Sequence, residues 1–172
     1  MMRLYHLIID GYNVIHHDPR YRSLAEHDLD AARTRLVEDV ASFAVGESRA
    51  VVVFDGEANP NSDGAPHRIA GVTVIFSASG ESADSVVEAL ARRGRERGER
   101  VTVVTSDAAT QWTVFAGEVS RMSSAEFSRR LEETGRDWEE HAPTGSVRGV
   151  LEDRIDDEVR QTLSRWARGN HP

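Results

Sequence analysis

Three aspartates lie at or just past the end of an apolar, β-branched segment, where a β-strand would stop: Asp10, Asp55 and Asp107. The carboxyl ends of parallel strands share one edge of a sheet, and open α/β sheets bind ligands along that edge. A fourth acid, Asp84, lies in the first turn of an expected helix, whose N-terminus would open onto the same edge. The spacing therefore predicts four carboxylates gathered along one edge of a parallel sheet.

Carboxylates that are brought close together repel one another, and they relieve the repulsion by binding protons or a cation. Hard divalent cations prefer oxygen ligands, and Mg²⁺ typically takes one or two carboxylates while it keeps several waters. A bound cation of this kind can activate water and stabilise charge on a transferring phosphate. We therefore expect these four acids, Asp10, Asp55, Asp84 and Asp107, to hold Mg²⁺ or Mn²⁺.

Each acid also has an ordinary structural explanation. Asp107 fits the N-cap of a helix, Asp55 fits a turn, and Asp84 fits a favourable charge at a helix dipole. Asp10 is the hardest to explain by structure alone, because it ends a strongly apolar strand. The joint placement of the four acids is what favours a functional site over four separate structural roles.

Three polar residues close to the acids are candidates for supporting roles. Asn13 offers hydrogen bonds to a phosphate or a metal-bound water, although it is also a good turn former. Ser106 is placed to orient Asp107, and Gln111 lies about one helical turn beyond that acid on the same face. Both Ser106 and Gln111 are equally compatible with solvated surface groups.

The chain has 172 residues and a formal net charge of −8, and its basic residues are all arginines. An acidic chain lacks the broad basic surface of proteins that grip naked nucleic acid. A local strip formed by Arg20 and Arg22, with Tyr12 and Tyr21 nearby, nevertheless fits phosphate contacts and base stacking, and Arg33 is a further basic candidate. The absence of cysteine excludes disulfides, thiolate zinc sites and a cysteine nucleophile.

Strand and helix patterns alternate along the chain, as in a parallel sheet that is covered on both faces. Apolar runs predict strands at residues 4–9, 50–54, 72–76, 101–105 and 119–122. Helical spacing and capping residues predict helices at about 29–43, 82–98, 107–117, 124–131 and 150–168. Composition predicts loops at 11–27, 57–66 and 134–149. We expect a single domain over residues 1–172, without a membrane-spanning run and located in the cytoplasm.

Four segments resemble the YacP-like branch of the NYN domain proteins, within the PIN-like ribonuclease superfamily: IIDGYNVIH, VVFDG, ESADSVVEAL and VVTSDAATQ. They occur in the family order, and the resemblance extends over about residues 4–169. It implies an α/β protein with a three-layer, Rossmann-like PIN fold, in which helices flank a mostly parallel central sheet. It also implies a metal-dependent endoribonuclease that cleaves single-stranded RNA.

The resemblance further implies roles for individual residues. The catalytic role falls on Asp10, Asp84 and Asp107, with Asn13 and Asp55 as supporting residues. The family also has small hydroxyl residues at two positions that are occupied here by Ser82 and Ser106.

RNA is the implied partner, and in some bacteria members of this branch are linked to RNA decay and to translating ribosomes. A ribosome would present messenger RNA at a high local concentration, which offsets a weak intrinsic grip on RNA. The sequence predicts no oligomeric state.

Three other functions compete with the nuclease. A phosphatase of the haloacid dehalogenase type is disfavoured, because it needs an acid where this chain has Tyr12 and a lysine that this chain lacks. A structure-specific DNA nuclease of the PIN-like group stays open, since a metal site does not itself distinguish ribose from deoxyribose. A non-catalytic RNA- or ribosome-binding module, whose acids only cap helices and turns, also stays open.

Overall fold

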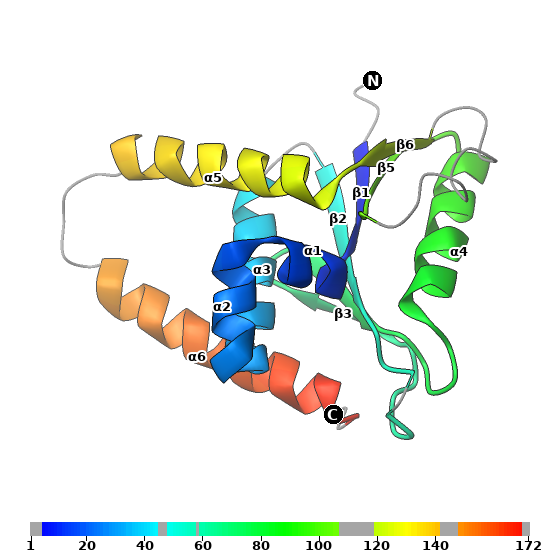
Figure 1. Ribbon diagram of the computed structural model, residues 1–172, viewed down its shortest axis with the longest axis horizontal. Coiled ribbons are helices and arrows are strands. Elements are labelled where there is room, and N and C mark those ends of the chain that lie inside the picture. Colours follow the sequence, from blue (N-terminus) through cyan, green and yellow to red (C-terminus); the bar gives the residue numbers. More distant parts are fainter. Residues whose placement is uncertain (1–4, 45–47, 58, 107–118, 142–147, 170–172) are drawn as a thin grey trace.

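A central sheet organises the computed structural model, which describes residues 5–44, 48–57, 59–106, 119–141 and 148–169 (Figure 1). Within these residues the strands are β1 (Tyr5–Asp10), β2 (Ser48–Phe54), β3 (Pro66–Ile69), β4 (Val72–Phe76), β5 (Arg100–Val104) and β6 (Val119–Met122). Their order across the sheet is β3-β4-β2-β1-β5-β6. Every neighbouring pair is parallel except β3 and β4, which are antiparallel.

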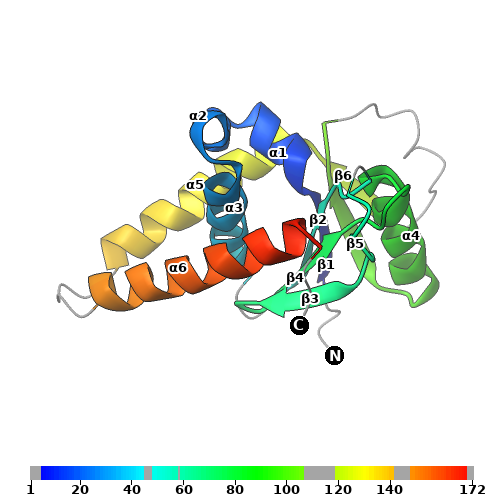
Figure 2. The same cartoon turned by 90° about the horizontal axis from the view of Figure 1, so that it is seen from below.

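Helices cover both faces of the sheet and complete three layers. The described helices are α1 (Gly11–His17), α2 (Pro19–His27), α3 (Leu29–Phe43), α4 (Ala83–Glu96), α5 (Ser124–His141) and α6 (Arg148–Ala167). Helix α4 lies alone on one face, and the other five lie on the opposite side (Figures 1 and 2). This arrangement confirms the predicted α/β class with a mostly parallel sheet between helical layers. No helix among the described residues combines the length and the apolar character needed to cross a bilayer.

Strand β1 lies at the centre of the sheet and contributes to two hydrophobic clusters. Leu7 and Ile9 join the cluster beneath α1, α3, α5 and α6, whereas Ile8 joins the cluster beneath α4. All three side chains are fully buried. Coverage on both faces explains why the strand reads as a continuous apolar run rather than as an alternating pattern.

The segment between β1 and α3 was predicted to be a loop, and this was wrong, because it forms α1 and α2. Asp18 separates the two helices: its N–H donates to the Val14 carbonyl, and its side chain accepts from the N–H of Arg20. Pro19 follows in the first helical turn, where its missing N–H costs nothing. Two short helices that share one capping residue therefore replace the expected loop.

Strand β3 was not predicted. It begins at Pro66, the last residue of the expected loop, and forms a hairpin with β4 through Ala70 and Gly71. Both turn residues have positive φ, 49° and 82°, which a two-residue hairpin of this hand requires. Alanine at the first position lacks the usual Asn-Gly or Asp-Gly signature, so the turn gives a weak sequence signal.

Helix α5 was predicted to end near residue 131, with a loop over 134–149. It instead continues to His141, and α6 begins at Arg148. Charge pairs one turn apart support the extension, Glu126 with Arg130 and Glu132 with Arg136. The helix expected at 107–117 lies outside the described residues, whereas the strand predicted at 119–122 is confirmed as β6.

The C-terminal end of α6 packs back onto the sheet. The Trp166 ring stacks on His67 of β3 with a centroid separation of 4.4 Å and an interplanar angle of 20°. Leu163 and Trp166 are buried in the same cluster as Leu7 and Ile9 of β1. The last helix is therefore part of the main core and not an appendage.

One half-buried histidine, His6, links β1 to the α4 side of the sheet. Nδ1 of His6 lies 3.2 Å from Oε2 of Glu99, and Nε2 is buried without a hydrogen-bond partner among the described residues. A second proton would therefore place an unpaired N–H in the interior. Burial lowers the pKa of His6 below 6.5, although Glu99 acts in the opposite direction.

We expect His6 to make the protein less stable in mild acid. The unfolded pKa is about 6.5 and the folded pKa is lower, so its stabilising contribution is present above that pH and is lost as the pH falls. His6→Gln should flatten this dependence. Urea denaturation of both proteins at about pH 7.5 and about pH 5.5 checks the difference, and equal pH dependence in the two proteins would contradict it.

Candidate active site at the carboxyl edge of the sheet

Asp10 ends the central strand β1 and at the same time caps α1. Its Oδ1 accepts a hydrogen bond from the Asn13 N–H at 3.3 Å, and the residue is only 9% exposed. Gly11 lets the start of α1 pack directly against Phe54, because a Cβ at this position would lie 2.5 Å from the Phe54 ring. The sequence Asp-Gly thus brings a buried carboxylate and a helix N-terminus together at the carboxyl edge.

Asp84 is brought to this same edge by the packing of α4. Ala83, its neighbour, lies in one buried cluster with Ile8 and Val53, which precede Asp10 and Asp55 by two residues each. Side chains alternate along a strand, so Asp10 shares the side of Ile8, which is the side that α4 covers. Ser82 caps α4, and its Oγ accepts from the Ser85 N–H at 3.3 Å. Ser82 therefore has a structural role at the helix start.

Asp55 follows β2 and is exposed. Its Oδ1 accepts from the N–H of Glu57 at 2.8 Å, which is the hydrogen bond of an Asx turn. In the register of the sheet Asp10 pairs with Val53, so Asp55 lies two residues farther out, about 7 Å along the strand direction. This offset separates Asp55 from Asp10.

The predicted four-carboxylate site stays a prediction, because one of its four acids, Asp107, lies outside the described residues. Among them, no three histidine, aspartate or glutamate side chains lie together as a set of metal ligands, so Asp10, Asp55 and Asp84 do not form one alone. Asp107 and Gln111 lie outside the described residues. The carboxylates of Asp10 and Asp84 are hard oxygen donors, and one or two such groups match the coordination habit of Mg²⁺. The chemistry of these donors therefore fits a divalent cation.

Asn13 connects three parts of the site. Its Oδ1 accepts a hydrogen bond from the Ser106 N–H at 2.8 Å and another from Ser124 Oγ at 2.7 Å. These bonds join α1 to the end of β5 and to the start of α5. The side-chain carbonyl of Asn13 thus holds Ser106, the residue directly before Asp107 in the sequence. Sequence reasoning did not assign Ser124 to the site, because its only signal was membership of a helix-capping sequence. The capping hydrogen bond is made by Ser123, whose Oγ accepts from the Glu126 N–H.

The arginine strip predicted on α2 is partly structural. Arg20 forms ion pairs with Asp18 at 2.8 Å and with Glu132 of α5 at 3.3 Å, whereas Arg22 is exposed. Tyr21 cannot stack on bases as expected, because it is buried at 1% exposure and its hydroxyl donates to Asp39 at 2.5 Å. Desolvation and the Asp39 carboxylate both raise the pKa of Tyr21.

Asp18 is the buried partner of Arg20. Burial by itself would raise the pKa of the Asp18 carboxyl, but hydrogen bonds from the Arg20 side chain and backbone outweigh it and hold the pKa below the ordinary value. A lowered folded pKa means that the contribution to stability is present above about pH 3.9 and is lost as the pH falls below it.

Arg20→Gln should therefore reduce the free energy of unfolding by about 1 kcal/mol at neutral pH, a value that allows for the partly exposed guanidinium. The deficit should shrink below about pH 3.9, where protonation of Asp18 weakens the pair in the parent protein as well. Urea titrations at neutral pH and below about pH 3.9 check this, with Arg22→Gln as the control on the same helix. A deficit of equal size in Arg22→Gln would contradict the assignment.

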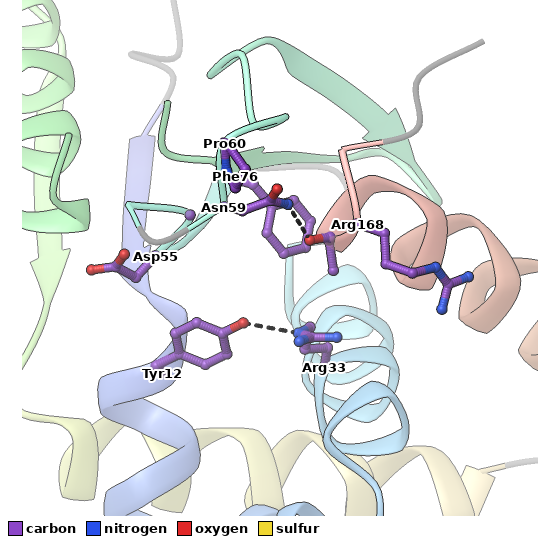
Figure 3. Close-up of a pocket in the computed structure, with 9 residues that line it drawn as sticks. Tyr12, Arg33, Asp55, Asn59, Pro60, Phe76 and Arg168 are labelled. Carbon is purple, nitrogen blue, oxygen red and sulfur yellow. Dashed lines mark hydrogen bonds between the residues drawn. The ribbon is translucent and has the colours of Figure 1, made fainter. Parts of the chain in front are cut away.

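A cavity of about 530 Å³ opens beside Asp55, on the side of the sheet opposite α4 (Figure 3). Its lining combines aromatic, cationic and amide side chains, including Tyr12, Arg33, Asn59, Phe76 and Arg168. Sequence reasoning did not find this cavity, because its walls come from five separate segments. The sequence signals were Tyr12, Arg33 and Asp55, but nothing in the sequence indicated that these three residues share one cavity.

A mostly parallel α/β sheet with acids at its carboxyl edge places the protein among the Rossmann-like α/β folds. The chain belongs to the YacP-like NYN domain family, which matches residues 7–168 and is part of a nuclease-like superfamily. This confirms the predicted family.

The relatives match nearly the full chain. "Uncharacterized protein YacP" of Bacillus subtilis (strain 168) is 29% identical over 174 residues, which cover 95% of this chain and 97% of that protein. The crystal structure of Rae1 (YacP) from Bacillus subtilis matches with a TM-score of 0.65 and 28% identity over 95% of each chain. A mutant of the same protein matches with a TM-score of 0.65 and 30% identity over 97% of each chain.

Proposed function

We propose that this protein is a metal-dependent endoribonuclease that cleaves single-stranded RNA by hydrolysis. The observation that carries the proposal is the position of Asp10, a buried carboxylate at the carboxyl end of the central strand. Burial of an acid is unfavourable unless hydrogen bonds or a cation stabilise it. The nuclease-like superfamily to which the chain belongs supports the same direction.

Asp10 and Asp84 would hold Mg²⁺ or Mn²⁺, together with Asp107 as the sequence predicts. When bound, the cation supplies activation of water and stabilisation of charge on the phosphate. The protein's own residues prepare the site. The Asn13 N–H donates to Asp10 and orients its side chain, while the α1 N-terminus adds a positive partial charge. The Asn13 side chain holds Ser106 in place through the Ser106 N–H.

We further propose that the substrate is messenger RNA presented at the ribosome, in the cytoplasm. A net charge of −8 disfavours tight binding to naked RNA, and presentation at a high local concentration would offset that deficit. After crosslinking in cells, the protein should sediment with ribosomal fractions. Sedimentation only with free protein would count against the ribosome as partner, while the nuclease proposal would be unaffected.

Incubation of the purified protein with single-stranded RNA and Mn²⁺ or Mg²⁺ tests the nuclease. Internal cleavage products are expected with either cation and none with EDTA. Single-stranded DNA of the same sequence should stay intact, and its cleavage would favour the DNA nuclease alternative. If naked RNA and ribosome-bound messenger RNA both stay intact with either cation, the nuclease proposal fails and a binding module remains.

A further inference from the structure

We propose that the cavity beside Asp55 binds one nucleotide of the RNA, with the base against Tyr12 and the phosphate at Arg168. This inference rests on the proposed function, because it names the part of the substrate that is held next to the candidate cleavage site. The size of the cavity, about 530 Å³, lies within the range of small-molecule sites in proteins.

The aromatic wall is held rigid by a buried arginine. Arg33 is 8% exposed, forms an ion pair with Asp30, and donates from Nε to the Tyr12 hydroxyl at 3.0 Å. Its guanidinium carbon lies 5.8 Å from the centroids of both Tyr12 and Phe76 (Figure 3). An aromatic surface that is fixed before binding loses little conformational entropy when a base stacks on it.

Arg33 is poorly suited to hold the phosphate. Its charge is already balanced by Asp30, and its hydrogen-bonding capacity is partly used by Tyr12. Arg168 differs, because it is exposed at the rim of the cavity, and its guanidinium extends outward, away from Tyr12 (Figure 3). It forms no ion pair with the other described residues. An arginine in this setting is the expected contact for a phosphate oxygen. The two arginines therefore have separate tasks: Arg33 positions the aromatic wall, and Arg168 meets the backbone of the RNA.

The wall opposite Tyr12 is formed by the loop after β2 and the end of α6, and contacts between these two segments fix the backbone near Arg168. Asn59 Nδ2 donates to the Ala167 carbonyl at 2.7 Å, which fastens the end of α6 to the loop after β2. Gly169 packs so closely on Asn61 that a Cβ at this position would clash with the Asn61 backbone. Its φ of 74° also favours glycine. These contacts keep the helix end, and with it Arg168, at the mouth of the cavity.

The cavity and the candidate cleavage site meet at Asp55. This residue lines the cavity, and Figure 3 shows its carboxylate at the end of β2, on the side away from Arg33. Asp10 and the α4 N-terminus lie on the other side of the same sheet edge. A single strand of RNA that crosses the edge at Asp55 would place one nucleotide in the cavity and a neighbouring phosphate near Asp10.

Equilibrium binding of a fluorescently labelled single-stranded RNA of about ten nucleotides, in EDTA, separates binding from cleavage. Arg168→Gln and Tyr12→Leu should each weaken binding about fivefold or more, in line with the loss of one phosphate contact or one stacked base. Tyr12→Phe keeps the ring but removes the acceptor of the Arg33 hydrogen bond, so it should weaken binding less than Tyr12→Leu does. The matched control is Arg165→Gln, which makes the same charge change one helical turn earlier and outside the cavity.

Thermal unfolding identifies any variant that fails to fold. Arg168→Gln changes an exposed side chain, so we expect this variant to fold even if Tyr12→Leu does not. Equal weakening by Arg168→Gln and Arg165→Gln would reduce the effect to the general charge of α6 and overturn the proposal. Unchanged binding in both Arg168→Gln and Tyr12→Leu would overturn it as well. Selective weakening together with no cleavage under any metal condition would refute the nuclease and retain the cavity as an RNA site.

Discussion

Asp10→Asn should reduce metal-dependent RNA cleavage by at least about 100-fold while the fold remains intact. The substitution removes the negative charge that would bind the cation, and a metal ion contributes several kcal/mol to the transition state of phosphate hydrolysis. The side-chain volume is nearly unchanged, and asparagine is as good an N-cap as aspartate, so the hydrogen bond to the Asn13 N–H is retained. Initial rates of RNA cleavage in Mn²⁺, together with circular dichroism and thermal unfolding, check both parts.

Asp28→Asn is the matched control for this variant. Asp28 caps α3 through a hydrogen bond to the Ala31 N–H, so the same chemical change is made at another helix start. Asp28 also pairs with Arg160 of α6 and is not one of the acids of the candidate site. We therefore expect Asp28→Asn to cleave RNA at the parent rate. If Asp10→Asn keeps a rate within about threefold of the parent, Asp10 does not bind an essential cation.

Asn13→Ala should lower the free energy of unfolding by about 2–4 kcal/mol, which for a chain of this size is roughly 5–10 °C in Tm. The substitution leaves the Ser106 N–H and the fully buried Ser124 hydroxyl without their acceptor. A buried donor that loses its partner costs about 1–3 kcal/mol, and here two donors lose the same oxygen. Urea denaturation and differential scanning calorimetry measure the loss.

A double-mutant cycle with Ser124→Ala isolates one of the two bonds. Ser124→Ala removes the donor and leaves Asn13 bonded to Ser106, so it should cost about 1 kcal/mol. The double variant should lose less than the sum of the two single losses, because both remove the same bond. Strict additivity would show that Asn13 and Ser124 contribute to stability independently.

Much of the sheet could be predicted from local sequence, because a strand covered on both faces is a continuous apolar run. The runs that became β1, β2, β4 and β5 were identified in this way. The missed helices are short, 7 residues for α1 and 9 for α2, and their stability comes from packing and from the shared cap at Asp18. Neither feature produces an apolar periodicity long enough to detect.

The candidate site shows the same division. Asp10 could be located from its position after one strand, whereas the bond between Asn13 and Ser124 joins residues 111 positions apart. That bond depends on β6, which pairs with β5 and so delivers the start of α5 to α1. Tyr12, Arg33 and Arg168 likewise converge only after α3 and α6 have packed together. The roles assigned to Asp107 and Gln111 stay predictions, since both lie outside the described residues.

The docking of α6 onto β3 and onto the loop after β2 has a consequence for synthesis of the protein. Domains generally fold as units while the polypeptide leaves the ribosome, and the N-terminal parts appear first. The sheet can pair β1 with β2 and β5 well before α6 has been made, but the wall that carries Arg168 arrives only with the last part of the described chain. A nascent chain would therefore hold a formed sheet while the proposed RNA cavity is still incomplete, and the cavity would be completed only after α6 has been made.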